Sequence, residues 1–425
     1  MAPIARPEHV TSGKGTHMVL HVDSEVGKLE QVMLHEPGLE LDRLTPQNCD
    51  ELLFDDVMWA RKAREEHRSF VDQLREKGVT VHLFRDKLGE ALEIPEARAF
   101  LLDRLVNKYT CGRHLVAPFR EMGEAATGAA LASFAIGGVL KSDLQLPKGA
   151  KSLYWDYLED TDFVLTPLPN HLFQRDNTAF AYSGLSVHPM AKPARKREIF
   201  NSRTIWNFHP EFKDDVYFYY GNGDHDHGPA TVEGGDVLVI GNGAVMIGMG
   251  ERTAPQGIEE LATAYFTAPK QEINKIIVVE LPKSRAFMHL DTAMTMIDKA
   301  TFSVYPFLPE DLRSFTLDKR GDAGEYSVRE NQSLFPVVAE ALGVEKVTAL
   351  RTPEPEFAAA HEQWDDGNNF LAVSPGVIFG YERNERTNTF LRRNGIEIVA
   401  ITGNELGRGR GGPRCMSCPM ERGPA

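Results

Sequence analysis

Cysteine is scarce in this chain of 425 residues, which contains only Cys49, Cys111, Cys415 and Cys418. Four cysteines in so long a chain are too few for the disulfide framework of a small secreted protein. Long apolar runs are also missing, because no uninterrupted stretch approaches the ~20 residues that a membrane span requires. Residues 1–15 have no apolar core of a secretory signal. We therefore expect a cytoplasmic protein that has no membrane partner.

Positive charge is the second deficit. The chain has 47 Lys and Arg against 61 Asp and Glu, which gives a formal net charge of -14. An acidic surface argues against nucleic acid as the main partner and suits a small cationic ligand. The 42% hydrophobic content is ordinary for a globular protein. A core of that size needs no disulfide bonds.

A strand–strand–helix–strand order recurs along the chain. Residues 177–220, 235–281 and 369–402 each show two short apolar strands around a Gly-containing turn, then a helix and a third strand. Residues 289–350 follow the same order more loosely, and residues 29–84 contribute a strand, a long helix and a strand. The sequence therefore predicts about five ββαβ modules, although a generic α/β protein would also produce some of this pattern.

The modular pattern is interrupted between Leu88 and about Thr161. This stretch contains helical and irregular segments with few strand signals. No Ser-, Gly- or Pro-rich linker separates it from its surroundings. We expect a helical insertion that packs on the main body.

Unusual polar residues precede the first strand of several modules. "HLFQRDN" carries Asp176, "VEGGDV" carries Glu233 and Asp236, and "MHLDT" carries His289 and Asp291. The "GRGRGGPRC" loop follows the last predicted strand and ends at Cys415. If the modules surround a common axis, these equivalent positions converge at one end of it.

Such a group of side chains has a definite chemical use. Clustered carboxylates repel one another unless a cation joins them, and a guanidinium matches carboxylates in a planar, bidentate way. A thiolate can attack an electrophilic carbon, while an imidazole gives and takes protons. The sequence therefore predicts attack on the central carbon of a guanidinium, with loss of an amine.

The C-terminal glycines and cysteines admit other interpretations. A phosphate-binding loop must open a helix, yet Pro413 follows the glycines at once. A redox Cys-x-x-Cys also needs a following helix, but Pro419 comes directly after Cys418. Zinc could use this pair with His225 and His227, although a structural zinc site usually has four ligands at characteristic spacings. Of these, zinc remains an open but weaker alternative.

The ordered motifs "FQRD", "EGGD", "MHLDT" and "GRGGPRCMS" resemble those of arginine deiminase, in the guanidino-group-modifying superfamily. The resemblance implies an α/β fold, a five-module propeller of ββαβ repeats with pseudo-fivefold symmetry and a helical insertion. The propeller would comprise residues 1–87 and 162–425, and the insertion would comprise residues 88–161.

The resemblance also implies catalytic roles. Cys415 resembles the nucleophile, and His289 resembles the general acid/base, oriented by Glu233. Asp176 and Asp291 resemble the carboxylates that bind the guanidinium nitrogens.

Six further residues resemble the substrate-binding side chains of the family. They are Asp236, a further carboxylate near the substrate; Arg195 and Arg252, which would hold the α-carboxylate with help from Asn170; Phe173, an apolar channel wall; and Arg410, a mobile arginine that guards the cysteine. From the residues alone, Arg195 and Arg252 would pass as surface charges.

The implied reaction is hydrolysis of L-arginine to L-citrulline and ammonia through a covalent amidino-cysteine intermediate. It requires no cofactor and no metal, and the family implies a homo-oligomer, a dimer or a tetramer. Alternatives are a dimethylarginine hydrolase, a peptidyl-arginine deiminase, an amidinotransferase or a non-catalytic arginine-binding protein. Asn177, where the family commonly has Pro, and Cys418, where we expect an apolar residue, depart from the pattern.

Overall fold

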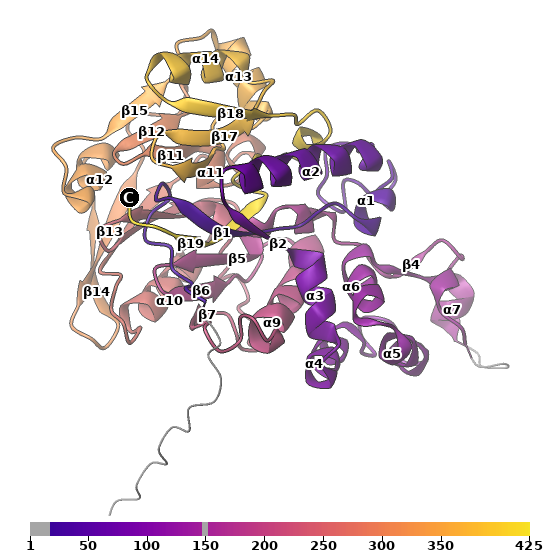
Figure 1. Cartoon of the computed structure of the whole chain (residues 1–425). Helices are drawn as coiled ribbons and strands as arrows, with labels where there is room; N and C mark the ends of the chain where they lie inside the picture. Colours follow the sequence, from indigo (N-terminus) through magenta and orange to yellow (C-terminus); the bar gives the residue numbers. More distant parts are fainter. Residues whose placement is uncertain (1–17, 147–151) are drawn as a thin grey trace, which may run out of the picture.

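A computed structural model describes residues 18–146 and 152–425. Residues 1–17, where we expect no secretory signal, and residues 147–151 of the expected insertion lie outside this described part. The fold is a mixed α/β arrangement of small sheets, none of them closed, with helices around them (Figure 1). Among the described residues, no helix is both long and apolar enough to cross a membrane.

Five of the sheets share one pairing pattern. Each contains a set of three strands in which the central strand pairs antiparallel with one neighbour and parallel with the other. Four of these sets are β5 (Thr178–Ala181), β6 (Gly184–Val187), β7 (Phe218–Tyr220); β8 (Val237–Gly241), β9 (Ala244–Met249), β10 (Lys275–Glu280); β11 (Met294–Asp298), β12 (Thr301–Val304), β15 (Thr348–Arg351); and β16 (Leu371–Ser374), β17 (Val377–Tyr381), β18 (Glu397–Ile401).

The fifth set joins the two ends of the described chain. β19 (Ser417–Arg422) lies antiparallel to β1 (Leu29–Leu34), which lies parallel to β2 (Thr80–Leu83) (Figure 1). In this register Leu34 is opposite Ser417. The C-terminal strand is thereby held beside the N-terminal strands, which fixes the loop that precedes it.

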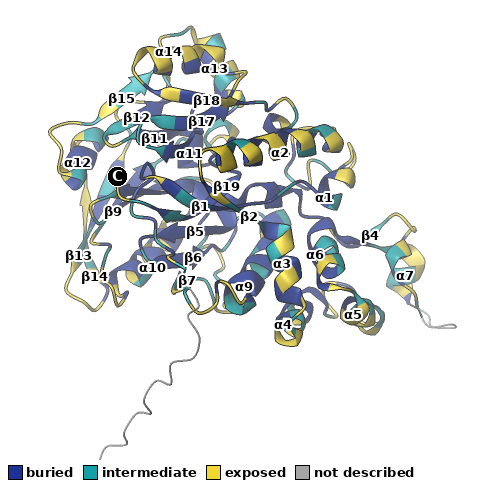
Figure 2. Cartoon of the chain, viewed as in Figure 1, coloured by how far each residue is buried: buried dark blue, intermediate teal, exposed yellow. Residues whose placement is uncertain are grey.

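In each set a helix lies between the second and third strands, as the modular sequence predicts. These helices are α2 (Ala60–Glu76), α9 (Glu198–Phe208), α10 (Pro255–Phe266), α12 (Leu334–Leu342) and α14 (Glu385–Arg393). Helix α2 illustrates why they form, because Ala63, Phe70 and Leu74 share one buried face at helical spacing. Its opposite face is exposed, whereas the strands beneath are largely buried (Figure 2).

Three elements are absent from the sequence prediction. The hairpin β13 (Ser314–Arg320) and β14 (Glu325–Glu330) extends the β8–β9–β10 sheet by pairing with β10, and helix α13 (Glu356–Trp364) follows β15. All β14 side chains are exposed or half-buried, although Tyr326 and Val328 alternate with polar residues. The hairpin was missed because it lies outside the ββαβ repeat and buries few apolar side chains.

The stretch expected to be an insertion is mainly helical. Residues 88–161 contain α4 (Pro95–Leu105), α5 (Val116–Ala125), α6 (Gly128–Gly137), the short strand β3 (Val139–Leu140) and α7 (Leu153–Tyr157). The expected boundaries fall inside α3 (Phe84–Leu92) and just before the short strand β4 (Phe163–Leu165). These helices gather on one side of the molecule (Figure 1). One hydrophobic cluster joins Leu88 and Leu101 to Phe180 of β5 and Trp206 of α9, so this side shares its core with the β5–β6–β7 set.

Candidate functional site

Short helical turns position the predicted site residues just before the first strand of each set. Asp176 lies in α8 (Gln174–Asn177) before β5, Asp236 in η4 (Gly234–Asp236) before β8, and Asp291 in α11 (Leu290–Ala293) before β11. Cys415 stands two residues before β19. Asn369 takes the corresponding place before β16. The sequence analysis missed Asn369, although the modular repeat itself points to that position.

The thiol of Cys415 is held by an amide and a carboxylate. Asn369 Nδ2 lies 3.1 Å from Cys415 Sγ, and the thiol lies 3.5 Å from Asp291 Oδ2. Asn369 Oδ1 also accepts hydrogen bonds from the backbone N–H groups of Arg414 and Cys415, each at 3.1 Å. Burial raises the pKa of Cys415 well above its usual range, and the carboxylates of Asp291 and Asp176 raise it further. In this arrangement the sulfur is a thiol.

His289 carries a positive charge in this site. Its Nε2 lies 2.8 Å from Glu233 Oε2, and its Nδ1 lies 3.7 Å from Asp176 Oδ1. Burial alone would lower the pKa of His289, but the charges of Asp176, Glu233 and Asp236 outweigh burial and raise it to about 9. The pKa of Glu233 is held low by Arg252 and His289 despite burial. The structure thus pairs an imidazolium with a carboxylate beside the cavity.

Arg195 is buried among carboxylates. Its Nη1 donates to Asp176 Oδ2 at 2.6 Å, while Nε and Nη2 donate to the two oxygens of Glu198 at 2.8 and 3.0 Å. Nη2 also lies 3.1 Å from the carbonyl oxygen of Asn170. The interpretation of Arg195 as a surface charge is therefore wrong. Its guanidinium is buried and holds Oδ2 of Asp176 in place.

Asp291 is fixed in a similar way by an arginine that the sequence analysis did not select. Arg414 Nη1 donates to Asp291 Oδ2 at 2.7 Å, and its Nε and Nη2 donate to Glu25 at 3.0 and 3.1 Å. The other oxygen of Asp291 is buried with no hydrogen-bond partner among the described residues. Each of the two carboxylates predicted to bind a guanidinium is therefore held by one of the chain's own arginines.

Arg252 and Asp236 lie on either side of the His289–Glu233 pair. Arg252 Nη1 lies 3.3 Å from Glu233 Oε2, and its buried Nε has no hydrogen-bond partner in the described part of the chain. Asp236 accepts from Thr253 Oγ1 at 2.6 Å and from the N–H of Leu290 at 2.8 Å. Burial raises the pKa of Asp236 to about 7. Arg252 faces the cavity, whereas Asp236 anchors the turn that carries His289.

The glycine-rich C-terminal loop covers the thiol. A cavity of about 20 Å³ reaches Cys415, Asp176 and His289, and Gly409 and Arg410 of the loop line it with Asn170, Phe173, Arg195, Arg252, Arg285, Met288, Thr292 and Leu53. Phe173 stacks on Phe54, and a Cβ on Gly411 would come within 2.2 Å of the Phe173 ring. Only glycine lets the loop approach so closely. The cavity has room for about one water molecule.

Arg410 adopts a left-handed backbone conformation with φ of 62°. Its guanidinium carbon lies 3.5 Å from the centre of the Trp364 ring, and its Nη1 lies 3.9 Å from Asp55 Oδ2. The side chain is buried, and Nε and Nη1 have no hydrogen-bond partner within the described ranges. Its contacts are therefore much weaker than those of Arg195 and Arg414.

Asn177 and Cys418, the two residues that depart from the family pattern, each contact neighbouring side chains. Asn177 donates to Glu198 Oε2 at 3.2 Å and accepts from Ser202 at 2.9 Å, so it supports the carboxylate that holds Arg195. Cys418 is buried in β19, with its sulfur 3.8 Å from Thr178 Oγ1. Cys418 thus packs between strands while Cys415 reaches the cavity.

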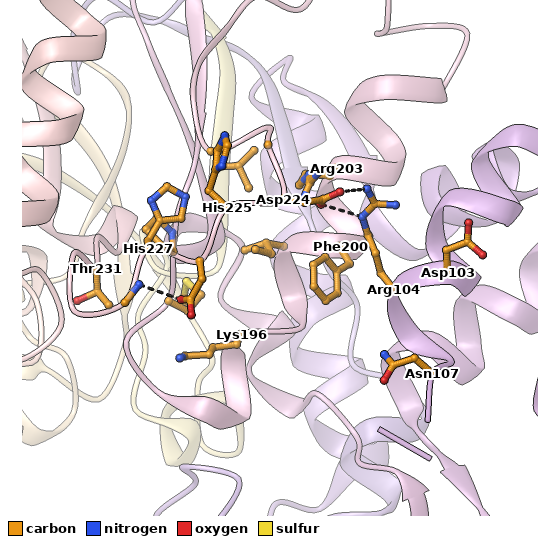
Figure 3. A pocket seen from close by; sticks show the side chains of 18 residues that line it. Asp103, Arg104, Asn107, Lys196, Phe200, Arg203, Asp224, His225, His227 and Thr231 are labelled. Carbon is orange, nitrogen blue, oxygen red and sulfur yellow. Dashed lines mark hydrogen bonds and ion pairs between the residues drawn. The ribbon is translucent and has the colours of Figure 1, made fainter. Parts of the chain in front are cut away.

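The residues of the zinc alternative do not come together. His225 and His227 line a separate cavity of about 410 Å³ between α4, α9 and residues 221–231, with Arg203 donating to Asp224 there (Figure 3). His227 Nδ1 lies 2.9 Å from the hydroxyl of Tyr220. No cysteine lines that cavity among the described residues.

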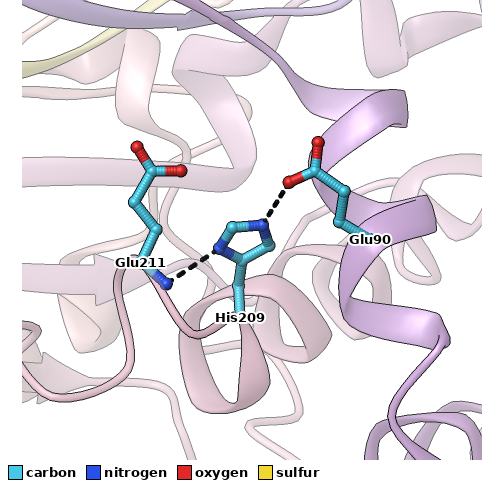
Figure 4. Close-up of side chains that lie close together, drawn as sticks. All are labelled: Glu90, His209 and Glu211. Carbon is cyan, nitrogen blue, oxygen red and sulfur yellow. Dashed lines mark hydrogen bonds and ion pairs between the residues drawn. The ribbon is translucent and has the colours of Figure 1, made fainter.

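Two other groups among the described residues have metal-ligand spacing. One is the Asp176, Glu233 and His289 group of the site itself. The other is Glu90, His209 and Glu211 (Figure 4). There the ammonium of Lys87 lies 3.1 Å from Glu90 and 2.6 Å from Glu211. A cation of the chain itself therefore already neutralises these carboxylates.

Known structures with the same fold come from enzymes that act on guanidino compounds. SxtG, an amidinotransferase from Microseira wollei in the saxitoxin biosynthetic pathway, aligns with a TM-score of 0.54 and 13% identity over 96% of this chain and 98% of that chain. The N-terminal domain of ArgZ, a cyanobacterial arginine dihydrolase solved with bound substrate, gives 0.50 and 11% over 92% and 98%. A dimethylarginine dimethylaminohydrolase adduct with S-methyl-L-thiocitrulline gives 0.50 and 15% over 92% and 99%.

Fold and site together define the class of guanidino-group-modifying enzymes. Within that class, the sequence profile described as arginine deiminase matches residues 50–422. The chain therefore belongs to the arginine deiminase family.

Proposed function

We propose that this protein hydrolyses L-arginine to L-citrulline and ammonia. The observation that carries the proposal is the convergence of a thiol, an imidazolium and the Asp176 carboxylate on one small cavity, with the Asp291 carboxylate beside the thiol. Asp176 and Asp291 would receive the guanidinium, and Cys415 lies 3.5 Å from Asp291, where it can reach the guanidinium carbon. Arg252, with its unpartnered Nε, would bind the α-carboxylate, whereas Arg195, whose nitrogens are bound to Asp176 and Glu198, would hold Asp176 in place.

Cys415 begins the reaction as the nucleophile. The bound guanidinium offsets the negative charges that hold Cys415 protonated, so the sulfur loses its proton to solvent as the substrate cation binds. The thiolate attacks the guanidinium carbon and forms a tetrahedral adduct. His289, charged in the resting site, protonates the departing nitrogen, and ammonia leaves behind an amidino-thioether on Cys415.

Hydrolysis follows on the same atoms. His289, now neutral, takes a proton from water, and the resulting hydroxide attacks the amidino carbon. Collapse of this second adduct breaks the carbon–sulfur bond, and the proton of the newly added hydroxyl passes to the departing sulfur, which releases neutral citrulline and restores the thiol. Glu233 keeps the imidazole oriented through both proton transfers, because it accepts from His289 Nε2 at 2.8 Å. No metal or organic cofactor is part of this proposal.

The five equivalent sheets support a propeller. Their common pairing and the convergence of Asp176, Asp291, Asn369 and Cys415 fit a pseudo-fivefold arrangement around the site, with residues 88–161 as an insertion. We also propose a cytoplasmic homo-oligomer, a dimer or tetramer, on the family resemblance alone.

The decisive experiment compares substrates that share a guanidinium. The purified protein is incubated with L-arginine, agmatine, N-methylated arginines and an arginyl peptide, and ureido product and ammonia are measured. We expect turnover of L-arginine and much less of agmatine, which lacks the α-carboxylate. Transfer of the amidino group to an added amine without ammonia release would instead favour the amidinotransferase alternative, and turnover of none of them would refute the proposal.

Two cysteine variants test the nucleophile. Cys415→Ser should abolish turnover, because a hydroxyl in this site has no comparable route to an anion. Cys418→Ser is the matched control and should retain most activity, since its sulfur packs against Thr178 between strands. Equal damage from both changes would contradict a single nucleophile.

A further inference from the structure

Strand β14 is an open edge of the largest sheet in the described part of the chain. That sheet has the order β14–β13–β10–β9–β8, and no described strand pairs with the outer side of β14. The strand lies at the rim of the molecule (Figure 1). Native proteins usually protect such an edge with proline, lysine or a bulge, because its unpaired backbone groups can pair with another chain. Glu325–Glu330 contains neither proline nor lysine, and its register with β13 is regular.

The backbone groups at this edge belong to alternate residues of β14. The N–H of Asn331 donates to the carbonyl of Ser314 at 2.9 Å, so these two residues form a hydrogen-bonded pair of the antiparallel β13–β14 ladder. Hydrogen-bonded and non-hydrogen-bonded pairs alternate along such a ladder. The backbone of Ser327 therefore bonds to β13, whereas the N–H and C=O groups of Tyr326 and Val328 point outward, where an added strand would bond to them.

An apolar groove lies beside this edge, on the face of the sheet that α10 covers. It has a volume of about 280 Å³, and Val328 lines it together with Leu317 of β13 and Ile258 of α10. Val328 is 59% exposed. Tyr326 is on the same face of the strand, with its ring 5.8 Å from that of Phe266 in α10. An exposed apolar groove beside an unpaired edge is typical of an interaction surface.

Two opposite charges lie on the other face of β14. Glu325 and Arg329 are both exposed, and neither forms an ion pair with any described residue. Arg329 instead donates to the side chain of Asn331 at 3.1 Å. The two charges are four positions apart on the same face, and Ser327 lies midway between them. The charges are therefore symmetric in position and opposite in sign about Ser327.

One register lets β14 pair with a second copy of itself. In an antiparallel pair with a two-fold axis at Ser327, Tyr326 of each copy lies opposite Val328 of the other, and Glu325 lies opposite Arg329. Tyr326 and Val328 then form the hydrogen-bonded pairs that their outward-pointing groups require. The tyrosine of the second copy adds to the apolar groove, and opposite charges meet on the other face, both of which stabilise paired strands.

Other registers satisfy fewer of these conditions. An axis that falls between two residues sets outward-pointing backbone groups against groups already bonded to β13. An axis at Tyr326 or at Val328 keeps the backbone bonds but leaves neither Glu325 nor Arg329 opposite a charge of the other sign. Only the axis at Ser327 matches backbone, apolar and charged groups at once.

We propose that β14 is a surface at which two copies of this chain join, as one continuous antiparallel sheet with its two-fold axis at Ser327. Each copy contributes the same strand, as a two-fold symmetric interface requires. The inference gives the homo-oligomer of the proposed function a surface and a register. It rests on the edge strand and does not depend on the reaction.

Charge reversal tests this surface. Sedimentation velocity of the full chain, from about 1 to about 100 μM, gives its mass and dissociation constant. Glu325→Arg and Arg329→Glu each set like charges opposite each other twice per dimer, so each should raise the dissociation constant at least about tenfold. The double variant restores the pairs in reverse order and should bind as the unaltered chain does. Glu96→Arg, the same change of charge on α4, is the matched control and should have no effect.

Cysteine cross-linking tests the register. At the axis, Ser327 faces its own copy in a non-hydrogen-bonded pair with Cα atoms about 4.5 Å apart, which is within the range of a disulfide. Ser327→Cys should therefore form a covalent dimer with oxidised glutathione, seen by non-reducing electrophoresis. Glu325→Cys and Arg329→Cys should cross-link when mixed but not alone, because each lies about 13 Å along the strands from its own copy. The unaltered chain, whose cysteines are buried or half-buried, is the control.

The outcomes separate this surface from the other proposals. A monomer at every concentration overturns both this surface and the homo-oligomer. An oligomer whose mass and dissociation constant are unchanged by both reversals overturns this surface alone, as does a double variant that binds as weakly as the single ones. A tetramer that the reversals reduce to a dimer supports it.

The cross-links decide between registers in the same way. Ser327→Cys that forms a disulfide only when mixed with Arg329→Cys would move the axis to Val328 and overturn the register. Far-UV circular dichroism shows that each variant is folded. None of these measurements uses turnover, so each result stands whether or not L-arginine is hydrolysed.

Discussion

Replacing Glu233 with glutamine tests whether His289 is charged in the resting site. Glutamine keeps the size of the side chain and can still accept from His289 Nε2, but it carries no charge. Glu233 is one of the carboxylates that outweigh burial and raise the pKa of His289 to about 9. We therefore expect the pKa of His289 to fall in Glu233→Gln.

The raised pKa of His289 also contributes to stability. The difference between its ordinary value of 6.5 and about 9, at about 1.4 kcal/mol per pH unit, corresponds to about 3 kcal/mol. Because the pKa in the folded state is the higher one, this stabilisation is present in full below about pH 6.5. It is lost as the pH rises through about 9. In Glu233→Gln the free energy of unfolding should fall by less as the pH rises, and the fall should occur at lower pH.

Two measurements check this prediction. The NMR resonance of the His289 ring, assigned by comparison with His289→Gln, is followed against pH and gives the midpoint of the His289 titration. Denaturant unfolding between about pH 6 and about pH 10 gives the free energy of unfolding at each pH. Glu40→Gln is the matched control, since Glu40 pairs with the buried His35 at 2.9 Å away from the cavity. A His289 midpoint near 6.5 in the wild type, or one unchanged by Glu233→Gln, would refute the reasoning.

Two further changes test the loop and the buried ion pairs. Gly411→Ala places a Cβ 2.2 Å from the Phe173 ring, so we expect lower kcat for L-arginine, whereas Gly250→Ala, with 3.6 Å to its nearest neighbour, should leave kcat unchanged. Arg414→Met leaves Glu25 and Asp291 buried without their cation, and we expect the free energy of unfolding to fall by about 3–5 kcal/mol in urea titrations. An unfolding midpoint equal to that of the wild type would contradict this account of Arg414.

Much of the framework could be predicted from the sequence, because its signals are local. Alternating apolar residues around Gly-containing turns indicate the strand pairs, and helical spacing indicates the helices between them. Once the repeat is seen, Asp176, Asp291 and Cys415 fall at matching positions before a strand. Asn369 occupies the same kind of position. It was missed because an amide side chain neither titrates nor acts as a nucleophile, so on its own it indicates no particular chemistry.

The buried ion pairs could not be predicted, because they join residues that are distant in sequence. Arg414 and Glu25 are 389 positions apart, and nothing near either residue indicates the other. Arg195 ends the short helical turn η3 (Pro193–Arg195) before α9 and has the sequence context of a surface charge, yet it is 2% exposed and bound to Asp176. The β13–β14 hairpin was missed for a related reason, since its pairing with β10 is decided by the sheet it joins.

The chain's own arginines also bear on how the site distinguishes arginine from citrulline. Arg195 and Arg414 each hold one oxygen of a carboxylate, which fixes the orientation of Asp176 and Asp291, and the second oxygen of Asp176 accepts only from the backbone N–H of Gly235 within the described ranges. Asp291 Oδ1 has no hydrogen-bond partner among the described residues, and Asp176 Oδ1 faces His289. A cavity of about 20 Å³ cannot hold a guanidinium until the loop moves. An entering cation then meets two oriented oxygens in a buried site, where a charged donor is bound far more strongly than the neutral ureido group of the product.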